Sequence, residues 1–198
     1  MEQFILIVLA LTSVIGLTFI LERGFALRRR KVIPPVVEEA VANCRTAAEL
    51  PMLRRLCEQK PSPMSRLLLV AADHLAWPKM ENIDAVQTRA RHEVTQLERG
   101  LVVLEIVVGV SPLLGLVGTI YGLITLFAGM GQGGLGDNSA LAKGIALALN
   151  ATLMGLLTAI PSLIAWSYYS KKVEMLAVEM ETLCDEFIRG QYREANPT

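Results

Sequence analysis

The chain has 198 residues, no net formal charge and a strongly apolar composition, with 53% hydrophobic residues and a mean hydropathy of +0.44. Soluble domains of this length are ordinarily less apolar. Because positive charge is not in excess, the composition does not favour a nucleic-acid partner. These properties indicate a membrane protein and exclude a strongly basic binder of DNA or RNA.

Three uncharged runs are each long enough to cross about 30 Å of hydrocarbon as a helix. They cover Phe4–Leu21, Ile106–Met130 and Gly144–Ser170. No basic residue precedes the first run, and Glu22-Arg23 follows it in place of a small-residue cleavage site, which favours an uncleaved span over a signal peptide. The sequence therefore predicts an all-α integral membrane protein with three transmembrane helices.

Basic residues mark the side of the membrane on which each span ends. They crowd the far end of the first span, at Arg23 and from Arg28 to Lys31, and Lys171-Lys172 close the third. Lys and Arg are enriched in cytoplasmic segments. We therefore expect a periplasmic N-terminus, a cytoplasmic C-terminus and a short periplasmic turn at Gly131–Lys143, with the Arg28–Lys31 cluster beside anionic lipid headgroups.

The region between the first two spans is polar and interrupted by prolines, which predicts a small cytoplasmic bundle of short helices. The prolines are Pro34, Pro35, Pro51, Pro61, Pro63 and Pro78. From Ile83 onward, apolar residues recur every three or four positions into the second span, so one continuous helix is expected from near Ile83 to near Met130. A similar stripe from Val173 to Ile188 extends the third span into the cytoplasm. The two long helices are expected to pack side by side.

Four parts follow from these patterns. Residues 1–31 carry the first transmembrane helix and its basic anchor, and residues 32–100 form the cytoplasmic helical region. Residues 101–172 hold the second and third transmembrane helices with their periplasmic turn, and residues 173–198 form a cytoplasmic helical tail. Cys44, Cys57 and Cys184 lack C-x-x-C spacing and fall in the cytoplasmic parts, where we expect reduced thiols.

The sequence contains no motif for catalysis or metal binding. Nucleophile-elbow and H-E-x-x-H patterns are absent, and His74 and His92 lie far apart in polar helices. We therefore expect no enzyme activity, no metal site and no cofactor.

Weakly polar residues within the spans are the remaining candidates for function. On a helical wheel Thr119 shares a face with three other residues, and Thr152 shares one with Ala148. The companions of Thr119 are Glu105, Pro112 and Gly115. Gly118 and Gly122 form a GxxxG pair, which lets helices approach closely in lipid, so packing is an alternative role for these glycines.

Two stretches carry a resemblance to a known family: SPLLGLVGTIYGLITLF and GIALALNATLMGLLTAIPSLIAWSYYSKK. They resemble the signature spans of the TolQ/ExbB/MotA proton-channel family, particularly its three-span TolQ/ExbB branch, most strongly from Pro112 to Pro161. The resemblance implies a homopentamer around two single-span helices of an ExbD- or TolR-like partner, whose aspartate carries the ion. It also implies a bacterial inner-membrane motor that drives a TonB-like or TolA-like protein.

Individual residues follow from that resemblance. The family's threonines in the second and third spans fall on Thr119 and Thr152, which would face the partner's aspartate. Family members usually have a glutamate five residues before the third-span threonine, and Leu147 stands there instead, so no role for that glutamate carries over. Asn150 lies about 60° round the helix from Leu147 and faces away from Thr152, so we expect it to hydrogen-bond to another helix.

Glu105 lies on the Thr119 face but 14 residues, or about 21 Å, toward the cytoplasm. It could line the inner ion exit, or it could be an interfacial charge facing water or Arg99. At the level of the whole chain, the alternative to an ion-conducting motor subunit is a structural membrane scaffold without ion flux, in which the small-residue faces only pack helices.

Overall fold

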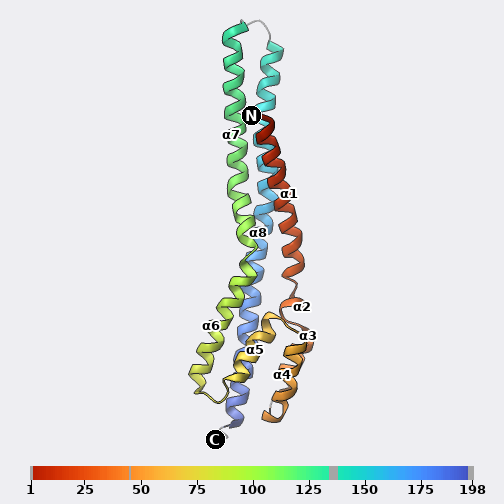
Figure 1. Ribbon diagram of the computed structural model, residues 1–198, viewed down its shortest axis with the longest axis vertical. Helices are drawn as coiled ribbons and strands as arrows, with labels where there is room; N and C mark the ends of the chain where they lie inside the picture. Colours follow the sequence, from red (N-terminus) through yellow and green to blue (C-terminus); the bar gives the residue numbers. More distant parts are fainter. Residues whose placement is uncertain (1, 45, 134–137, 196–198) are drawn as a thin grey trace. The chain divides into compact units, whose positions relative to one another are not determined.

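The computed structural model describes residues 2–44, 46–133 and 138–195, and in these ranges the chain forms helices and no strand. The all-α fold class is thereby confirmed. The helices, shown in Figure 1, are α1 (Glu2–Ala26), α2 (Arg29–Val32), α3 (Pro35–Asn43), the 3-10 helix Ala47–Glu49, α4 (Leu50–Gln59), α5 (Pro63–Asp73), α6 (Lys79–Glu98), α7 (Leu101–Gly133) and α8 (Asn138–Ala195).

The chain divides into two compact units, each assembled from segments distant in sequence. The three-helix unit comprises Met1–Arg23 and Gly100–Tyr168, and the bundle unit comprises Gly24–Arg99 and Tyr169–Thr198. Helix α7 belongs wholly to the three-helix unit, whereas α1 and α8 contribute to both.

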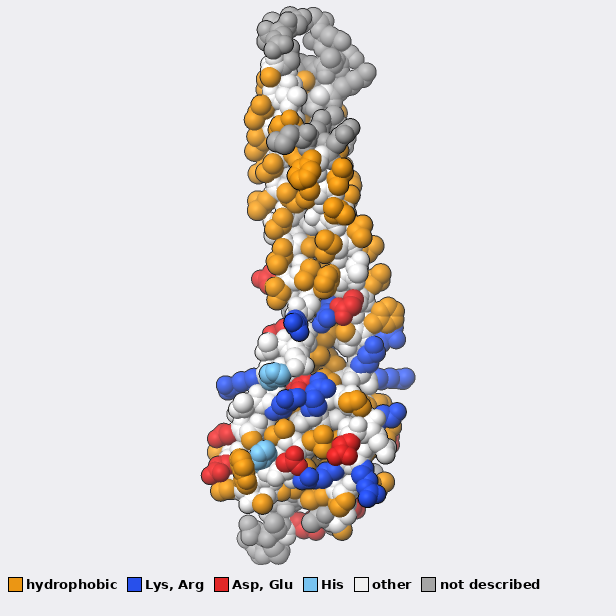
Figure 2. Space-filling view, viewed as in Figure 1, with side chains coloured by type: hydrophobic (Ala, Val, Ile, Leu, Met, Phe, Trp, Pro, Cys, Tyr) orange, Lys and Arg blue, Asp and Glu red, His pale blue; other side chains and the backbone are white. Residues whose placement is uncertain are grey.

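Three helical segments are long and apolar enough to cross a membrane, which confirms the three predicted spans. They are Phe4–Ala26, Leu101–Ala128 and Gly144–Glu194. Large apolar side chains cover the visible surface of the three-helix unit, whereas charged residues are frequent on the bundle unit (Figure 2). An apolar exterior of this kind is stable in hydrocarbon and unstable in water.

In the three-helix unit, α1, α7 and α8 pack through small residues. Gly16 of α1 approaches α8 so closely that an added Cβ would lie 3.1 Å from Ser162 Oγ and 3.2 Å from Val107 Cγ1 of α7. Farther along α7, a Cβ at Gly118 would lie 3.3 Å from Ile5 Cγ2. Helices in lipid associate through such close van der Waals contacts, because burying apolar surface gains little where the solvent is itself apolar.

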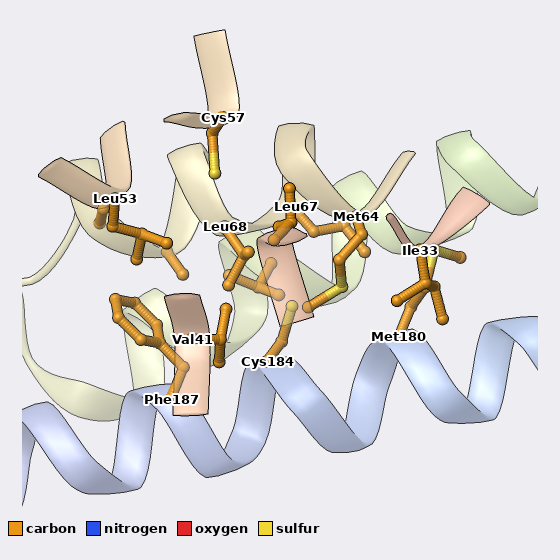
Figure 3. Close-up of a cluster of buried hydrophobic side chains, with 14 of the residues drawn as sticks. Ile33, Val41, Leu53, Cys57, Met64, Leu67, Leu68, Met180, Cys184 and Phe187 are labelled. Carbon is orange, nitrogen blue, oxygen red and sulfur yellow. The ribbon is translucent and has the colours of Figure 1, made fainter. Parts of the chain in front are cut away.

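The bundle unit is held by a conventional apolar core (Figure 3). Figure 3 shows side chains from α4, α5 and α8 converging on one cluster that includes Leu67, Leu68, Met180 and Phe187. The prolines act as expected, since Pro35, Pro51 and Pro63 occupy the first turns of α3, α4 and α5. Burial of the apolar core side chains from water supplies the main stabilisation of the bundle unit.

A buried charge links α5 to α6 inside the bundle unit. The Glu93 side chain has no exposed surface, and its carboxylate accepts from Arg66 Nε at 2.8 Å and pairs with the guanidinium of Arg89 at 2.7 Å. Burial alone would raise the pKa of Glu93, but the hydrogen bonds from Arg66 and the charges of both arginines outweigh it and lower that pKa below 4.5. Glu93 is therefore a fixed carboxylate of the bundle.

The continuous helix expected from Ile83 to Met130 is interrupted. Helix α6 ends at Glu98 and α7 begins at Leu101. The guanidinium of Arg23 fills the space that a side chain at Gly100 would need, and glycine weakens the helix at this point. Apolar periodicity continues across the break, which is why the sequence pattern did not indicate it.

Helical structure also extends farther into the predicted periplasmic turn than expected. Helix α7 continues to Gly133, and α8 begins at Asn138. Residues 134–137 of that turn lie outside the described part of the chain.

Candidate functional site

The hydroxyls of Thr119 on α7 and Thr152 on α8 meet directly. Their Oγ1 atoms share a short hydrogen bond, and both side chains are half-buried at the edge of the α7–α8 contact. Sequence analysis predicted each threonine on a separate helix face, and the structure brings the two together.

Two backbone carbonyls complete this hydroxyl pair. Thr119 Oγ1 lies 3.1 Å from the Ala148 carbonyl oxygen and 3.2 Å from that of Gly115, and Thr152 Oγ1 lies 3.2 Å from the same Gly115 oxygen. Each hydroxyl has one proton to donate, so the two protons are shared among more acceptors than they can satisfy at once. The pair can therefore change its hydrogen-bond directions without moving the helices.

Close backbone contact between α7 and α8 creates this geometry. A Cβ at Gly115 would lie 2.9 Å from the Ala151 carbonyl oxygen and 3.0 Å from Thr152 Cα. A Cβ at Gly155 would lie 2.6 Å from the Ser111 carbonyl oxygen. These obstacles are backbone atoms, which cannot rotate aside, so only glycine allows the Gly115 carbonyl to come within reach of Thr152.

Two further glycines continue the same contact. A Cβ at Gly118 would lie 2.6 Å from Ala151 Cβ, and one at Gly122 would lie 2.9 Å from Ala148 Cβ. The GxxxG pair thus packs α7 against α8 at the level of the threonines. Together with Gly115 and Gly155 it forms what we call the glycine seam.

The structure also places the other predicted site residues. Ala148 is buried and supplies a carbonyl to the hydroxyl pair, and Pro112 is half-buried within α7. Glu105 is exposed on α7, 14 positions before Thr119. Asn150 is exposed on α8 and forms no hydrogen bond with any residue that the structure describes. Glu105 and Asn150 are therefore not part of the cluster.

Sequence analysis missed Ala151 and Gly155, the residues of α8 that lie against Gly115 and Gly118. Their spacing, Ala151-x-x-x-Gly155, is the same small-residue pattern as Gly118-x-x-x-Gly122 and was the available signal. Ser111 was missed as well: it is fully buried, and its hydroxyl has no partner in the described part of the chain.

The arrangement limits the chemistry of the site. Between Leu101 and Tyr168 the only charged residues of the sequence are Glu105, Asp137 and Lys143. Among the described residues, no group of three or more His, Cys, Asp or Glu side chains could hold a metal ion. The threonine pair offers neutral hydroxyls that both donate and accept, a suitable contact for a group that changes its protonation state.

Known proteins support the family resemblance that the second and third spans indicated. The family described as the MotA/TolQ/ExbB proton channel family matches residues 59–182. The chain is 30% identical over 199 residues to the Tol-Pal system protein TolQ of Pseudomonas aeruginosa, with 93% of this chain and 85% of that protein covered.

Two shorter matches lie in the ExbB group. The chain is 37% identical over 81 residues to the biopolymer transport protein ExbB of Helicobacter pylori, covering 41% of this chain and 56% of that protein. It is 28% identical over 168 residues to a putative ExbB homolog of Methanothermobacter thermautotrophicus, covering 84% and 59% respectively. With its three apolar spans and these matches, the chain is a membrane protein that belongs to the MotA/TolQ/ExbB proton channel family.

Proposed function

We propose that this chain is the channel-wall and stator subunit of an ion-driven membrane motor, which conducts protons together with a single-span partner resembling ExbD or TolR. The observation that carries this proposal is the Thr119–Thr152 hydroxyl pair at the edge of the α7–α8 contact. The two threonines lie in the uncharged runs Ile106–Met130 and Gly144–Ser170, which contain no carboxylate. The titrating carboxylate is then supplied by the partner's helix.

The hydroxyl pair suits a carboxylate that loads and releases a proton. Toward the ionised form, a threonine hydroxyl donates a hydrogen bond while the other donates to the carbonyl of Gly115 or Ala148. Toward the protonated form, a threonine oxygen accepts. Because the pair is neutral, it lowers the desolvation cost of the carboxylate without the strong attraction of a full charge pair, so the proton is not trapped.

The assembly in this proposal contains five copies of the chain around two partner helices in a bacterial inner membrane. The N-terminus lies in the periplasm and the C-terminus in the cytoplasm, which the basic residues Arg28–Lys31 and Lys171-Lys172 support. Alternating protonation of the partner's carboxylates drives the partner helices round the ring.

The motor would perform envelope work through a TonB-like protein in outer-membrane uptake or a TolA-like protein in envelope maintenance. The TolQ and ExbB names of the relatives support both tasks. Pro112 removes one backbone hydrogen bond of α7 and thereby aids bending near the pathway.

Glu105, exposed on α7 and separated from Thr119 by 14 positions, would line the inner exit. In the assembled motor, Glu105→Gln should therefore lower proton flux, because it removes the negative charge from the exit. Unchanged flux would remove Glu105 from the pathway.

Co-expression with the single-span partner tests the proposal. The assembled complex is reconstituted in liposomes and proton flux is measured for the wild type, Thr152→Val and Thr152→Ser. Valine keeps the shape of threonine but removes the hydroxyl, so flux should fall by about tenfold or more while serine retains it.

Thr158→Val is the matched control, because within the described part of the chain the Thr158 hydroxyl bonds only to the Met154 carbonyl of its own helix, at 3.0 Å. Its flux should equal that of the wild type. An intact Thr152→Val complex with wild-type flux would contradict the proposal and favour a structural scaffold, in which the glycine seam only packs helices.

A further inference from the structure

Asn150 is a polar side chain on the apolar exterior of α8. Its side chain is exposed and makes no hydrogen bond with any described residue. The surrounding surface is aliphatic, with Leu149, Leu153 and Leu157 exposed by 58%, 52% and 58%. The residue lies inside the uncharged run Gly144–Ser170, six positions from its start.

The threonine hydroxyls of this unit find their hydrogen-bond acceptors within the chain. Every threonine of the three-helix unit has a backbone carbonyl within hydrogen-bond distance: Thr12, Thr18, Thr119, Thr125, Thr152 and Thr158. A hydroxyl can do this because it reaches the carbonyl one turn earlier in its own helix. The Asn150 amide has two donor hydrogens and a carbonyl, and it has no such partner here.

Hydrocarbon provides no hydrogen-bond partner for an exposed amide. Asparagine side chains in transmembrane helices accordingly bond to neighbouring helices. Since the described helices of this chain do not supply that bond, a helix of another polypeptide must cover Asn150 in the membrane.

The positions of the side chains round α8 indicate which polypeptide covers Asn150. Two positions separate Asn150 from Thr152, a rotation of 200° that places the two side chains on nearly opposite faces of α8. A single partner helix beside Thr152 therefore cannot also reach Asn150, and α7 and α1 occupy a third face, where Ala148, Ala151 and Ser162 are buried. A second copy of the chain remains.

We propose that Asn150 forms a hydrogen bond across the contact between two copies of this chain and fixes the relative register of the copies. The choice of a second copy over the single-span partner rests on the proposed function, which places the partner beside Thr152. The covering surface is a transmembrane helix face of the neighbouring copy that offers a hydrogen-bond donor or acceptor among aliphatic side chains.

The first experiment measures self-assembly of the full chain expressed without any partner. Wild type, Asn150→Leu and Asn150→Gln are purified in mild detergent, and the oligomer distribution is followed by native mass spectrometry across a detergent dilution series. Leucine should weaken self-association by about tenfold, whereas glutamine, which keeps the amide, should restore part of it.

Thr125→Val is the matched control. Thr125 is also exposed in the three-helix unit, but its hydroxyl donates to the Tyr121 carbonyl at 2.9 Å, so its removal should leave self-association unchanged. Wild-type assembly by Asn150→Leu, or equal losses in Asn150→Leu and Thr125→Val, would overturn the proposal.

Photo-cross-linking in native membranes identifies the neighbour, because it needs no reactive group on the covering helix, and in a ring of copies Asn150 meets a different surface of its neighbour. With the partner present, a benzophenone-bearing amino acid in place of Asn150 should give covalent dimers of this chain on irradiation, while the wild type should give none. Cross-links to the partner, or no cross-link to a second copy, would overturn the choice of neighbour. Self-assembly needs no ion flux, so these results are independent of whether Thr152→Val conducts protons.

Discussion

The two units of this chain are held together by different kinds of contact. In the three-helix unit, backbones meet at glycine and alanine, and an added methyl group at Gly155 would collide with a carbonyl oxygen. In the bundle unit, large side chains such as Leu67 and Met180 fill a core sealed from water. The packing therefore follows the environment of each unit. In water, large apolar side chains stabilise a core by their burial, whereas in lipid helices are stabilised by close approach of their backbones.

The two units also differ in how they use polar groups. The bundle unit buries a charged carboxylate, Glu93, between two arginines. The three-helix unit keeps only neutral hydroxyls in its helix contact, with unused hydrogen-bond capacity at Thr119 and Thr152. A group that must respond to a moving proton benefits from the second arrangement, because a neutral hydroxyl can both donate and accept, whereas an ionised carboxylate only accepts.

Unfolding of the two units can be followed separately, because each unit has its own spectroscopic or chemical reporter. All three cysteines lie in the bundle unit and are buried, and burial raises the pKa of Cys57 to about 11 and that of Cys184 to about 12. Thiol labelling therefore reports opening of the bundle. Trp166 lies in the three-helix unit, and its fluorescence, in a Trp77→Phe background, reports on that unit.

The largest effect is expected for Leu67→Ala in the bundle core. Leu67 is fully buried, and truncation should lower the free energy of unfolding by about 3 kcal/mol through lost burial and the cavity left behind. Thiol labelling under denaturant should accelerate accordingly, with Trp166 little affected at first. Met52→Ala is the control, since Met52 is 79% exposed and should show almost no change.

A smaller effect, in the other unit, is expected for Gly155→Ala. Its new methyl group would meet the Ser111 carbonyl oxygen, and the helices must separate to admit it, at a cost of about 2 kcal/mol. The Trp166 signal should shift to milder denaturing conditions. Gly109→Ala is the control, because nothing lies within 4 Å of a Cβ there. Equal effects of the two substitutions would show that the glycine seam does not hold the unit.

The smallest stability effect is expected for Glu93→Gln, about 1 kcal/mol at neutral pH, because both arginines are partly exposed and can turn to water. The folded-state pKa of Glu93 is depressed, so its contribution is complete above about pH 4.5 and is lost as pH falls below that value. Thiol labelling requires the thiolate and slows in acid, so unfolding is followed here by the fluorescence of Trp77, which lies in the bundle unit, in a Trp166→Phe background. The denaturant concentration that unfolds the wild type should fall in this acidic range, and that fall should be smaller in Glu93→Gln. If the stability of the wild type and that of Glu93→Gln depended on pH in the same way, this role of Glu93 would be contradicted.

The sequence predicts much of this molecule because its strongest signals are local. Apolar runs define the spans, and prolines mark the starts of α3, α4 and α5. A helical wheel also places Thr119 and Thr152 on defined faces of their helices.

Contacts between helices are harder to predict. The wheel gives no axial register between α7 and α8, so the hydrogen bond between the two threonines emerges only when the glycine seam fixes that register. The helix break at Gly100 escapes prediction because apolar periodicity continues through it. Asn150 was expected to bond to another helix, and no described helix of this chain provides that bond.

The central claim is that Thr119 and Thr152 act as one hydrogen-bonded unit beside a carboxylate of the partner. A double-mutant cycle of proton flux tests it most directly, with Thr119→Val, Thr152→Val and the double variant reconstituted with the partner in liposomes. Each single substitution should reduce flux by about tenfold or more, and the double variant should be no worse than the single ones, because breaking the pair once removes its function. Wild-type flux in the single variants, or losses that multiply in the double variant, would contradict the account.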